Sequence, residues 1–263
     1  MSMTLFDTHA HYDARQFDPD RDQVLSALPG RGVELVVNPG CDLASSRKAV
    51  ELAGRYPFVY AAVGVHPEDC GDWTDEDVEE LRALANHPKV VAVGEIGLDY
   101  YWPENPPKEL QKRVFRAQLA LARELDLPVI VHDREAHGDS LDIVRQFPQV
   151  RGVFHCFSGS AGMARELVKL GWMISFTGVL TYPNARKAVE AAQAVPLDRL
   201  MIETDSPYMA PVPCRGKRNH SGYVAHICAR LAELKGISPQ ECARITGDNG
   251  KKFFSIPSEC GYL

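Results

Sequence analysis

Several features that would place this chain in a familiar class are missing from it. No stretch approaches the roughly 20 apolar residues that a membrane-spanning helix needs. The first fifteen residues contain Asp7, Asp13 and Arg15 and no apolar core of a secretory signal. The seven cysteines are an odd number, and no two of them have Cys-x-x-Cys spacing. This argues against a disulfide framework and a zinc-ribbon site. We therefore expect a cytoplasmic protein with no membrane association.

An excess of positive charge is also absent. The formal net charge at pH 7 is −6, which speaks against broad, non-specific binding of duplex nucleic acid, because such binding needs many phosphate contacts. A nuclease that holds one phosphodiester through bound metal stays possible, since its pocket needs carboxylates. No linker, low-complexity tract or charge run divides the chain. We therefore expect residues 1–263 to form a single domain.

The sequence does contain a repeated alternation of short apolar runs and amphipathic stretches. Eight runs are predicted to be strands: Leu5–His9, Val33–Asn38, Val59–Val65, Val90–Glu95, Val129–His132, Gly152–His155, Met173–Phe176 and Leu200–Glu203. Helices are predicted near residues 20–28, 42–55, 74–86, 107–125, 135–147, 160–170, 184–194, 221–235 and 238–254. This alternation implies parallel strands with right-handed crossovers, and the length suits a barrel of about 250 residues. The prediction is an α/β fold, a single (β/α)8 TIM barrel, with a doubly wound open sheet as the alternative.

Histidines and carboxylates follow several of the predicted strands. His9 and His11 end the first strand, and because side chains alternate along a strand they share a face with Asp7. Similar groups end four later strands: Glu95, His132, His155, Glu203 and Asp205. In a barrel of this kind the chemistry sits at the C-terminal ends of the strands. The pattern therefore predicts that these side chains meet on one rim.

Together these side chains are suited to bind metal. Four imidazoles (His9, His11, His132, His155) and two carboxylates (Glu95, Asp205) exceed what one tetrahedral ion needs, which favours two divalent ions. Glu95 is the candidate for a bridging ligand, because Gly94 and Gly97 would let the backbone and the metals approach closely. Imidazoles mixed with carboxylates suit zinc, manganese or iron, whereas magnesium prefers oxygen. The choice among Mg²⁺, Mn²⁺ and Zn²⁺ therefore stays open.

Two carboxylates after the last strand are candidate catalytic residues. Two metal ions can hold a scissile phosphoryl oxygen, generate hydroxide and steady the leaving oxygen. Asp205 is predicted to contact metal and also to take the proton from the attacking water. Glu203, two residues earlier, has the same facing and is predicted to orient a ligand or to be a lesser one. Glu95 could instead be only a buried salt-bridge partner. An unpaired buried carboxylate is costly, however, and no Arg follows at a suitable spacing.

Candidate substrate contacts lie on the same rim. Arg215, Lys217 and Arg218 follow the last strand, and Arg134 follows His132 by two residues; all four are predicted to contact a phosphate backbone. His66, before a proline, is predicted to line the pocket rather than to bind metal.

Neighbouring residues have plainer interpretations. Cys156 alternates to the face opposite His155 and is predicted to pack. The aromatics Trp73, Tyr100, Tyr101 and Trp102 either stack on a base or cap the barrel.

Six segments together resemble the TatD family of metal-dependent deoxyribonucleases, which belongs to the amidohydrolase-like barrels. They are Phe6-Asp7-Thr8-His9-Ala10-His11, Gly64-Val65-His66-Pro67, the run from Gly94 to Tyr101, the run from Val131 to Ala136, His155-Cys156-Phe157-Ser158-Gly159 and the run from Glu203 to Tyr208. The resemblance covers nearly the whole chain in the family's order. It implies that the six residues His9, His11, Glu95, His132, His155 and Asp205 bind divalent metal. It also implies hydrolysis of DNA, often as a 3′-to-5′ exonuclease that prefers single strands.

The chain departs from the family pattern in two places. The loop Arg215-Gly216-Lys217-Arg218-Asn219 also resembles the family, but His220-Ser221-Gly222 follows it in place of an acidic or small residue and a proline. Asp133 replaces the small residue expected after His132.

Two other functions remain possible on the sequence. A hydrolase of the same barrel class could cleave an amide or ester, for example on an aminoacyl-tRNA, with the same metal hydroxide. A metal-binding or scaffolding protein without catalysis is the third class. We expect a deoxyribonuclease whose partner is DNA and which is a monomer or weak oligomer.

Overall fold

All eight predicted strands occur within residues 3–257, the part of the chain that the computed structural model describes. Their bounds are β1 Leu5–Asp7, β2 Val33–Pro39, β3 Val59–Val63, β4 Val90–Asp99, β5 Val129–Arg134, β6 Gly152–Phe154, β7 Met173–Phe176 and β8 Leu200–Ile202. Each strand pairs in parallel with the next, in the order of the sequence. The strands therefore form one sheet whose carboxyl ends share a rim.

The first and last strands are drawn together. The amide of Thr8 donates to the carbonyl of Ile202 at 3.3 Å, and the amide of Asp205 donates to the carbonyl of His9 at 2.9 Å. The Asp7 carboxylate also accepts from the backbone N–H and the hydroxyl of Thr204, at 2.8 and 2.6 Å. The sheet is thus a nearly closed barrel, which confirms the predicted TIM barrel and excludes the open sheet.

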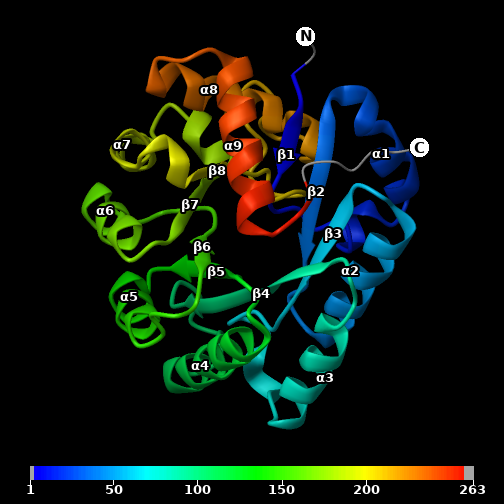
Figure 1. Ribbon diagram of the computed structural model, residues 1–263, viewed down its shortest axis with the longest axis vertical. Coiled ribbons are helices and arrows are strands. Elements are labelled where there is room, and N and C mark those ends of the chain that lie inside the picture. The colour runs from blue at the N-terminus through cyan, green and yellow to red at the C-terminus, as the bar shows by residue number, and fades with distance from the viewer. Residues whose placement is uncertain (1–2, 258–263) are drawn as a thin grey trace.

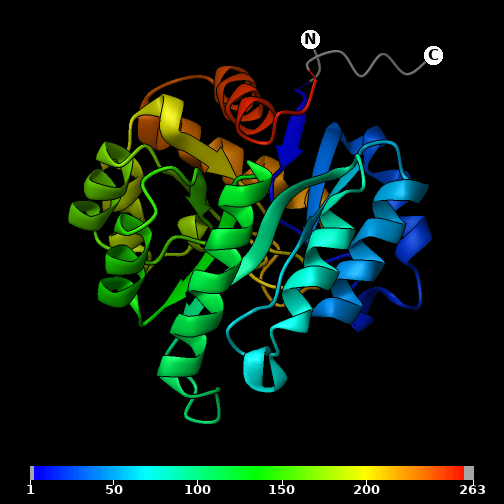
Figure 2. The same ribbon diagram turned by 60° about the horizontal axis from the view of Figure 1, so that its bottom comes forward.

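Nine α-helices follow the predicted order among the described residues. They are α1 Arg21–Ala27, α2 Leu43–Arg55, α3 Glu76–Ala85, α4 Lys108–Leu125, α5 His137–Arg145, α6 Ala161–Lys169, α7 Arg186–Ala194, α8 Val224–Lys235 and α9 Pro239–Phe253. Figure 1 shows them arranged around the strands, and Figure 2 shows α4 along the outside of β4. α9 packs against β1 and β8. Its first turn carries Pro239 behind the Ser238 cap, whose hydroxyl accepts from the Glu241 amide. No helix in this part of the chain combines the length and the apolar character needed to cross a bilayer.

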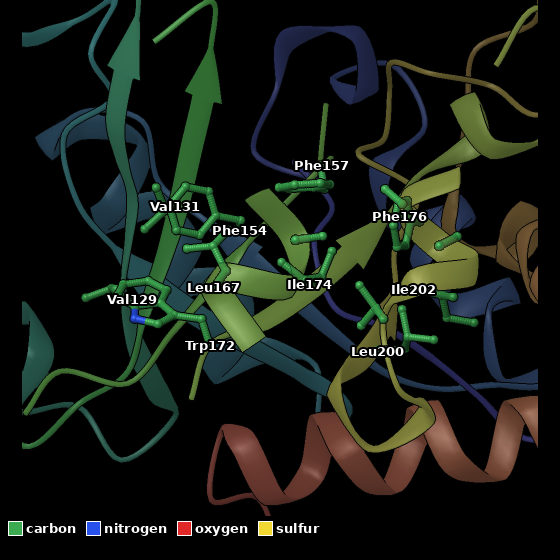
Figure 3. Close-up of a cluster of buried hydrophobic side chains, with 14 of the residues drawn as sticks. Val129, Val131, Phe154, Phe157, Leu167, Trp172, Ile174, Phe176, Leu200 and Ile202 are labelled. Atoms are coloured by element: carbon green, nitrogen blue, oxygen red, sulfur yellow. The ribbon is translucent and has the colours of Figure 1, made fainter. Parts of the chain in front are cut away.

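The strands are buried on both faces. In β5, Val129 and Val131 face the helices, whereas Ile130 between them belongs to the cluster inside the barrel. Figure 3 shows the outer layer, in which side chains of β5 to β8 pack with Leu167 of α6 and with Trp172. Truncation of one such side chain to Ala typically costs about 2–5 kcal/mol. This packed frame fixes the strand ends that carry the polar residues.

β4 extends further than predicted, to Asp99, and comes very close to β5. Gly97 has φ +141°, and a Cβ there would lie 2.0 Å from the carbonyl oxygen of His132. A Cβ on Gly94 would lie 2.7 Å from the Cβ of Ile130. These glycines admit the neighbouring strand, which confirms the predicted close approach of the backbone, while the approach of a metal stays a prediction. Their effect is to bring Glu95 beside His132.

Candidate metal centre

The six predicted metal ligands meet at the carboxyl ends of the strands, below a pocket of about 900 Å³. They are His9, His11, Glu95, His132, His155 and Asp205. His9 is fully buried, and Glu95 and Asp205 are 3% and 8% exposed. Residues from five different strands therefore lie together on one rim, as the sequence predicts. Which of them bind metal stays a prediction.

Glu95 lies at the middle of this cluster. Its Oε2 is 3.2 Å from the Nε2 of His9 and 3.4 Å from the Nε2 of His11. Its Oε1 is 2.7 Å from the Nε2 of His155 and 2.9 Å from the Nδ1 of His132. Oε2 thus faces His9 and His11, whereas Oε1 faces His132 and His155, with His66 as a third ring 3.3 Å away. Such a carboxylate is placed to serve two cations, one on each side.

Asp205 stands on the His9 and His11 side. Its Oδ1 is 3.5 Å from the Nε2 of His11 and 3.9 Å from that of His9. The residue has a left-handed backbone, φ +54°, and its N–H donates to the His9 carbonyl. Burial acts to raise the pKa of Asp205, but His11, His9 and His155 hold it below its ordinary value. The carboxylate is therefore ionised at neutral pH.

Two further carboxylates orient imidazoles from behind. Asp99, fully buried, places Oδ2 2.9 Å from the Nε2 of His132. Burial acts to lower the pKa of His132, but its hydrogen bonds to Asp99 and Glu95 raise it to about 9. Glu203 places Oε1 3.3 Å from the Nδ1 of His155, on the side away from Glu95. Both contacts match the arrangement in which a carboxylate fixes the ring of a metal-binding histidine.

Asp99 was not among the residues that sequence reasoning selected. It lies in the same segment as Glu95 and is the last residue of β4. Because the two residues are four apart, strand alternation places Asp99 on the same face as Glu95. That signal is present in the sequence, but the predicted strand ends at Glu95, and alternation was not followed beyond it.

His66 lies against the same cluster. Its Nε2 is 3.3 Å from the Oε1 of Glu95, and its Nδ1 accepts the backbone N–H of Glu68 at 3.2 Å. Burial, together with the charge on His132, lowers the pKa of His66 to about 4. In the neutral ring the proton is then on Nε2 and is donated to Glu95. This arrangement accords with the predicted pocket wall, because the nitrogen facing Glu95 has no free lone pair.

The donor set fits divalent metal. Within residues 3–257 the Nδ1 of His9 is buried and makes no hydrogen bond, which is costly unless something compensates it, whereas the Nδ1 of His155 has the Glu203 carboxylate 3.3 Å away. The Nε2 atoms of His9 and His11 are only 3.0 Å apart. Burial acts to raise the pKa of Glu95, but His155, His66 and His9 hold it well below its ordinary value. Buried carboxylates among closely spaced imidazoles are the ligand chemistry of zinc, manganese or iron.

Two predictions about facing side chains were wrong. Asp7 does not lie with His9 and His11 but bonds to Thr204, because β1 ends at Asp7 and strand alternation stops there. Cys156 lines the pocket rather than packing on the opposite face. β6 ends at Phe154, and Cys156 turns the chain with φ +41°, so that its N–H donates to Glu203 at 2.6 Å.

The four basic residues predicted to contact phosphate have different surroundings. Arg134 lines the pocket, and among the described residues its guanidinium makes no ion pair or hydrogen bond. Arg215 stacks on the ring of Tyr182, 3.8 Å from its centroid, and Lys217 is exposed. Arg218 instead pairs with Asp20, its Nη2 2.7 Å from the carboxylate.

Lys187 is a further pocket-lining cation that sequence reasoning missed. It lies in the first turn of α7, after the connection that follows β7 on the same rim. That position was the available signal.

Of the aromatics, Trp73 is buried and Tyr100 donates its hydroxyl to Asp139 at 2.7 Å. Tyr101 and Trp102 are 49% and 43% exposed, and Trp102 lines the pocket.

Comparison with known proteins gives consistent matches over most of the chain. The family model described as "TatD related DNase" matches residues 6–255. The "Uncharacterized metal-dependent hydrolase YabD" of Bacillus subtilis is 45% identical over 254 residues, which cover 96% of this chain and 99% of the relative. The "3'-5' ssDNA/RNA exonuclease TatD" of Salmonella typhimurium is 35% identical over 261 residues, which cover 96% and 99%. The crystal structure of YJJV, a TatD homolog from Escherichia coli, is 33% identical with a TM-score of 0.90 and covers 96% of this chain and 98% of that one.

Proposed function

The chain belongs to the TatD-related DNase family of metal-dependent hydrolases, and from this premise we propose that it hydrolyses the phosphodiester bonds of DNA. In this proposal it acts as a 3′-to-5′ exonuclease on single strands. The proposal rests on the position of Glu95, whose two oxygens face separate sets of imidazoles at the base of an open pocket. A site divided in this way suits phosphoryl transfer, which gains from charge stabilisation on both the attacking and the leaving oxygen.

We assign the metal ligands to both sides of Glu95. His9, His11 and Asp205 would hold one cation, His132 and His155 the other, and Glu95 would be shared. Bound there, divalent ions would lower the pKa of the attacking water and stabilise charge on the phosphoryl oxygens. Mg²⁺, Mn²⁺ and Zn²⁺ are the candidates.

The protein's own groups supply the remaining steps. Asp205 takes the proton of the attacking water on its carboxylate, which is ionised at neutral pH. Glu203 acts through His155 and the Cys156 N–H, and so holds the ring in place rather than touching substrate. His66 donates to Glu95 and forms part of the wall.

Substrate binding rests on the cations that the pocket exposes. Arg134 and Lys187 both line it and would contact the phosphates on either side of the scissile bond. Arg215 and Lys217 lie on the loop after β8 and would contact more distant phosphates. Arg218 is revised: its ion pair with Asp20 makes it a support for this loop rather than a phosphate ligand.

A nuclease assay tests the proposal. The protein is stripped of metal, and Mg²⁺, Mn²⁺ or Zn²⁺ is restored one at a time with single-stranded DNA, duplex DNA and RNA. A 3′-labelled single strand should release labelled mononucleotide first, and the Asp205→Asn protein should not. Absence of cleavage with every metal, together with hydrolysis of an amide or acyl ester, would overturn the proposal in favour of the other hydrolase class.

A further inference from the structure

Exposed apolar side chains gather at the mouth of the barrel. Among the described residues six large ones are 40% exposed or more: Tyr101, Trp102, Leu170, Tyr208, Met209 and Val212. All but Leu170 belong to the loops after β4 and β8. These two strands are four places apart in an eight-stranded barrel, so their loops face each other across the mouth. Apolar surface concentrated around one polar pocket indicates a binding site.

The loop after β4 has a defined arrangement. The rings of Tyr101 and Trp102 meet edge to face, with centroids 4.7 Å apart. The guanidinium carbon of Arg134 lies 3.7 Å from the centroid of Tyr101 and 5.4 Å from that of Trp102. Trp102 and Arg134 line the same pocket as Glu95 and His132. The indole and the guanidinium are flat groups, and a flat, uncharged ligand can stack on either.

This loop is tied to the metal centre through Asp99. One oxygen of that carboxylate contacts His132, while the other accepts the Tyr101 N–H at 2.9 Å and the Asn105 side-chain amide at 3.0 Å. The Tyr100 N–H also donates to the Arg134 carbonyl at 2.9 Å. The aromatic loop therefore keeps a fixed position relative to the cluster that would act on the phosphodiester.

We propose that Trp102, with Arg134 held flat by Tyr101, forms a subsite for one unpaired nucleobase adjacent to the scissile phosphate. The inference rests on the proposed nuclease function and names the feature of the substrate that this rim recognises. A base can present its face to Trp102 only when that face is not stacked in a duplex, so the subsite selects single strands. Arg134 serves twice, since its plane supports the base while its N–H groups remain available to a phosphate oxygen. Stacking tolerates every base, so little sequence preference is expected.

The test compares two oligonucleotides and three variants of the metal-loaded protein. One oligonucleotide is a natural single strand, and the other has abasic tetrahydrofuran residues at its three 3′-terminal positions. The variants are Trp102→Ala, Trp102→Phe and, as a matched control, Leu170→Ala, which removes an exposed apolar side chain beyond the C-terminal end of α6, away from the mouth. Two quantities are measured: kcat/KM, and the change in tryptophan emission on rapid mixing before turnover. Trp73 and Trp172 are buried, so an emission change on mixing reports on Trp102.

The parental protein and Leu170→Ala should lose kcat/KM on the order of tenfold when the bases are removed, because aromatic stacking on one base has about that value. Trp102→Ala should show the same loss on the natural strand and no further loss on the abasic one. Trp102→Phe should recover most of the difference. The preference for single strands over duplex should shrink in Trp102→Ala alone.

Two results would overturn the subsite. The first is an unchanged ratio between natural and abasic strands in Trp102→Ala. The second is a change in sedimentation of Trp102→Ala with no change in base dependence, which would make the aromatics an interface between copies. Failure of the nuclease proposal can be told apart from failure of the subsite. If the parental protein cleaves neither strand, tryptophan emission still shows whether Trp102 binds a base. A change with the natural strand and none with the abasic strand would support the base subsite, and no change with either would reject it.

Discussion

Asp99→Asn tests the carboxylates that orient the imidazoles. The substitution keeps the shape of the side chain, but the amide donates a hydrogen bond where the carboxylate Oδ2 accepted one from His132. The His132 Nε2 must then become the acceptor, which moves the ring proton to Nδ1. Nδ1 is the atom that faces Glu95 at 2.9 Å. The lone pair that would bind a cation is thereby lost in the neutral ring.

The expected loss of metal affinity can be set from what such orienting carboxylates usually contribute. Residues that orient metal-binding histidines typically contribute about 10- to 100-fold in metal affinity or activity, which corresponds to about 1.4–2.7 kcal/mol. Asp99→Asn keeps an oxygen that can accept from the Tyr101 N–H and the Asn105 amide, so the loop after β4 should stay in place. Most of the loss should therefore appear in metal binding.

Competition with a chromogenic zinc chelator measures this loss, and urea unfolding of the metal-free protein measures the stability. Asp139→Asn is the matched control, because this carboxylate bonds to Tyr100 and Lys112 and contacts none of the six clustered side chains. We expect weaker zinc binding for Asp99→Asn and parental binding for Asp139→Asn. Parental zinc affinity in a folded Asp99→Asn protein would refute the assigned role of Asp99.

Three other substitutions have clear expectations. Asp205→Asn should leave the urea midpoint near that of the parent and lower kcat by two orders of magnitude or more, about 3 kcal/mol; turnover at the parental rate would exclude Asp205 as the base. Arg134→Gln should weaken single-strand binding and reduce its salt dependence by about one phosphate contact, whereas Arg218→Gln should leave both largely unchanged; filter binding across a salt series distinguishes the two. Gly97→Ala should lower the free energy of unfolding in urea by about 3 kcal/mol or more, because the new Cβ meets a backbone oxygen at 2.0 Å. Gly216→Ala is the control: it is also at positive φ but in open space, and it should lower this free energy by about 1–2 kcal/mol.

The barrel was predictable because its signals are local and repeated. Each strand is a short apolar run buried on both faces, and each helix has its own amphipathic period, so no single segment decides the fold. The convergence of His9, His132 and Asp205 then followed from one rule about parallel barrels. These residues lie far apart in the sequence, yet the rule places them together without any knowledge of distances.

The parts that failed depend on where a strand stops. Asp7 and Cys156 were assigned faces by alternation, but β1 ends at Asp7 and β6 ends before His155. Asp99 was overlooked because β4 continues past Glu95. β4 continues because Leu98 and Asp99 still pair with Asp133 and Arg134 of β5, and pairing between strands is not visible in one sequence.

Pairing of charges was also beyond sequence reasoning. Arg218 belongs to a basic run, and its partner Asp20 lies far from it in the sequence, so the ion pair could not be predicted. Arg134, by contrast, has an aromatic partner rather than an acidic one and so stays available to substrate. The two arginines look alike in the sequence and differ in the fold.

The central claim is that side chains from five strands jointly hold two divalent cations, with Glu95 between them. Anomalous diffraction from crystals loaded with Mn²⁺ tests this claim most directly, because it locates the ions without assuming their ligands. We expect two peaks, one beside His9, His11 and Asp205 and one beside His132 and His155, each next to an oxygen of Glu95. Peaks elsewhere, or none among these side chains in manganese-saturated crystals, would contradict it.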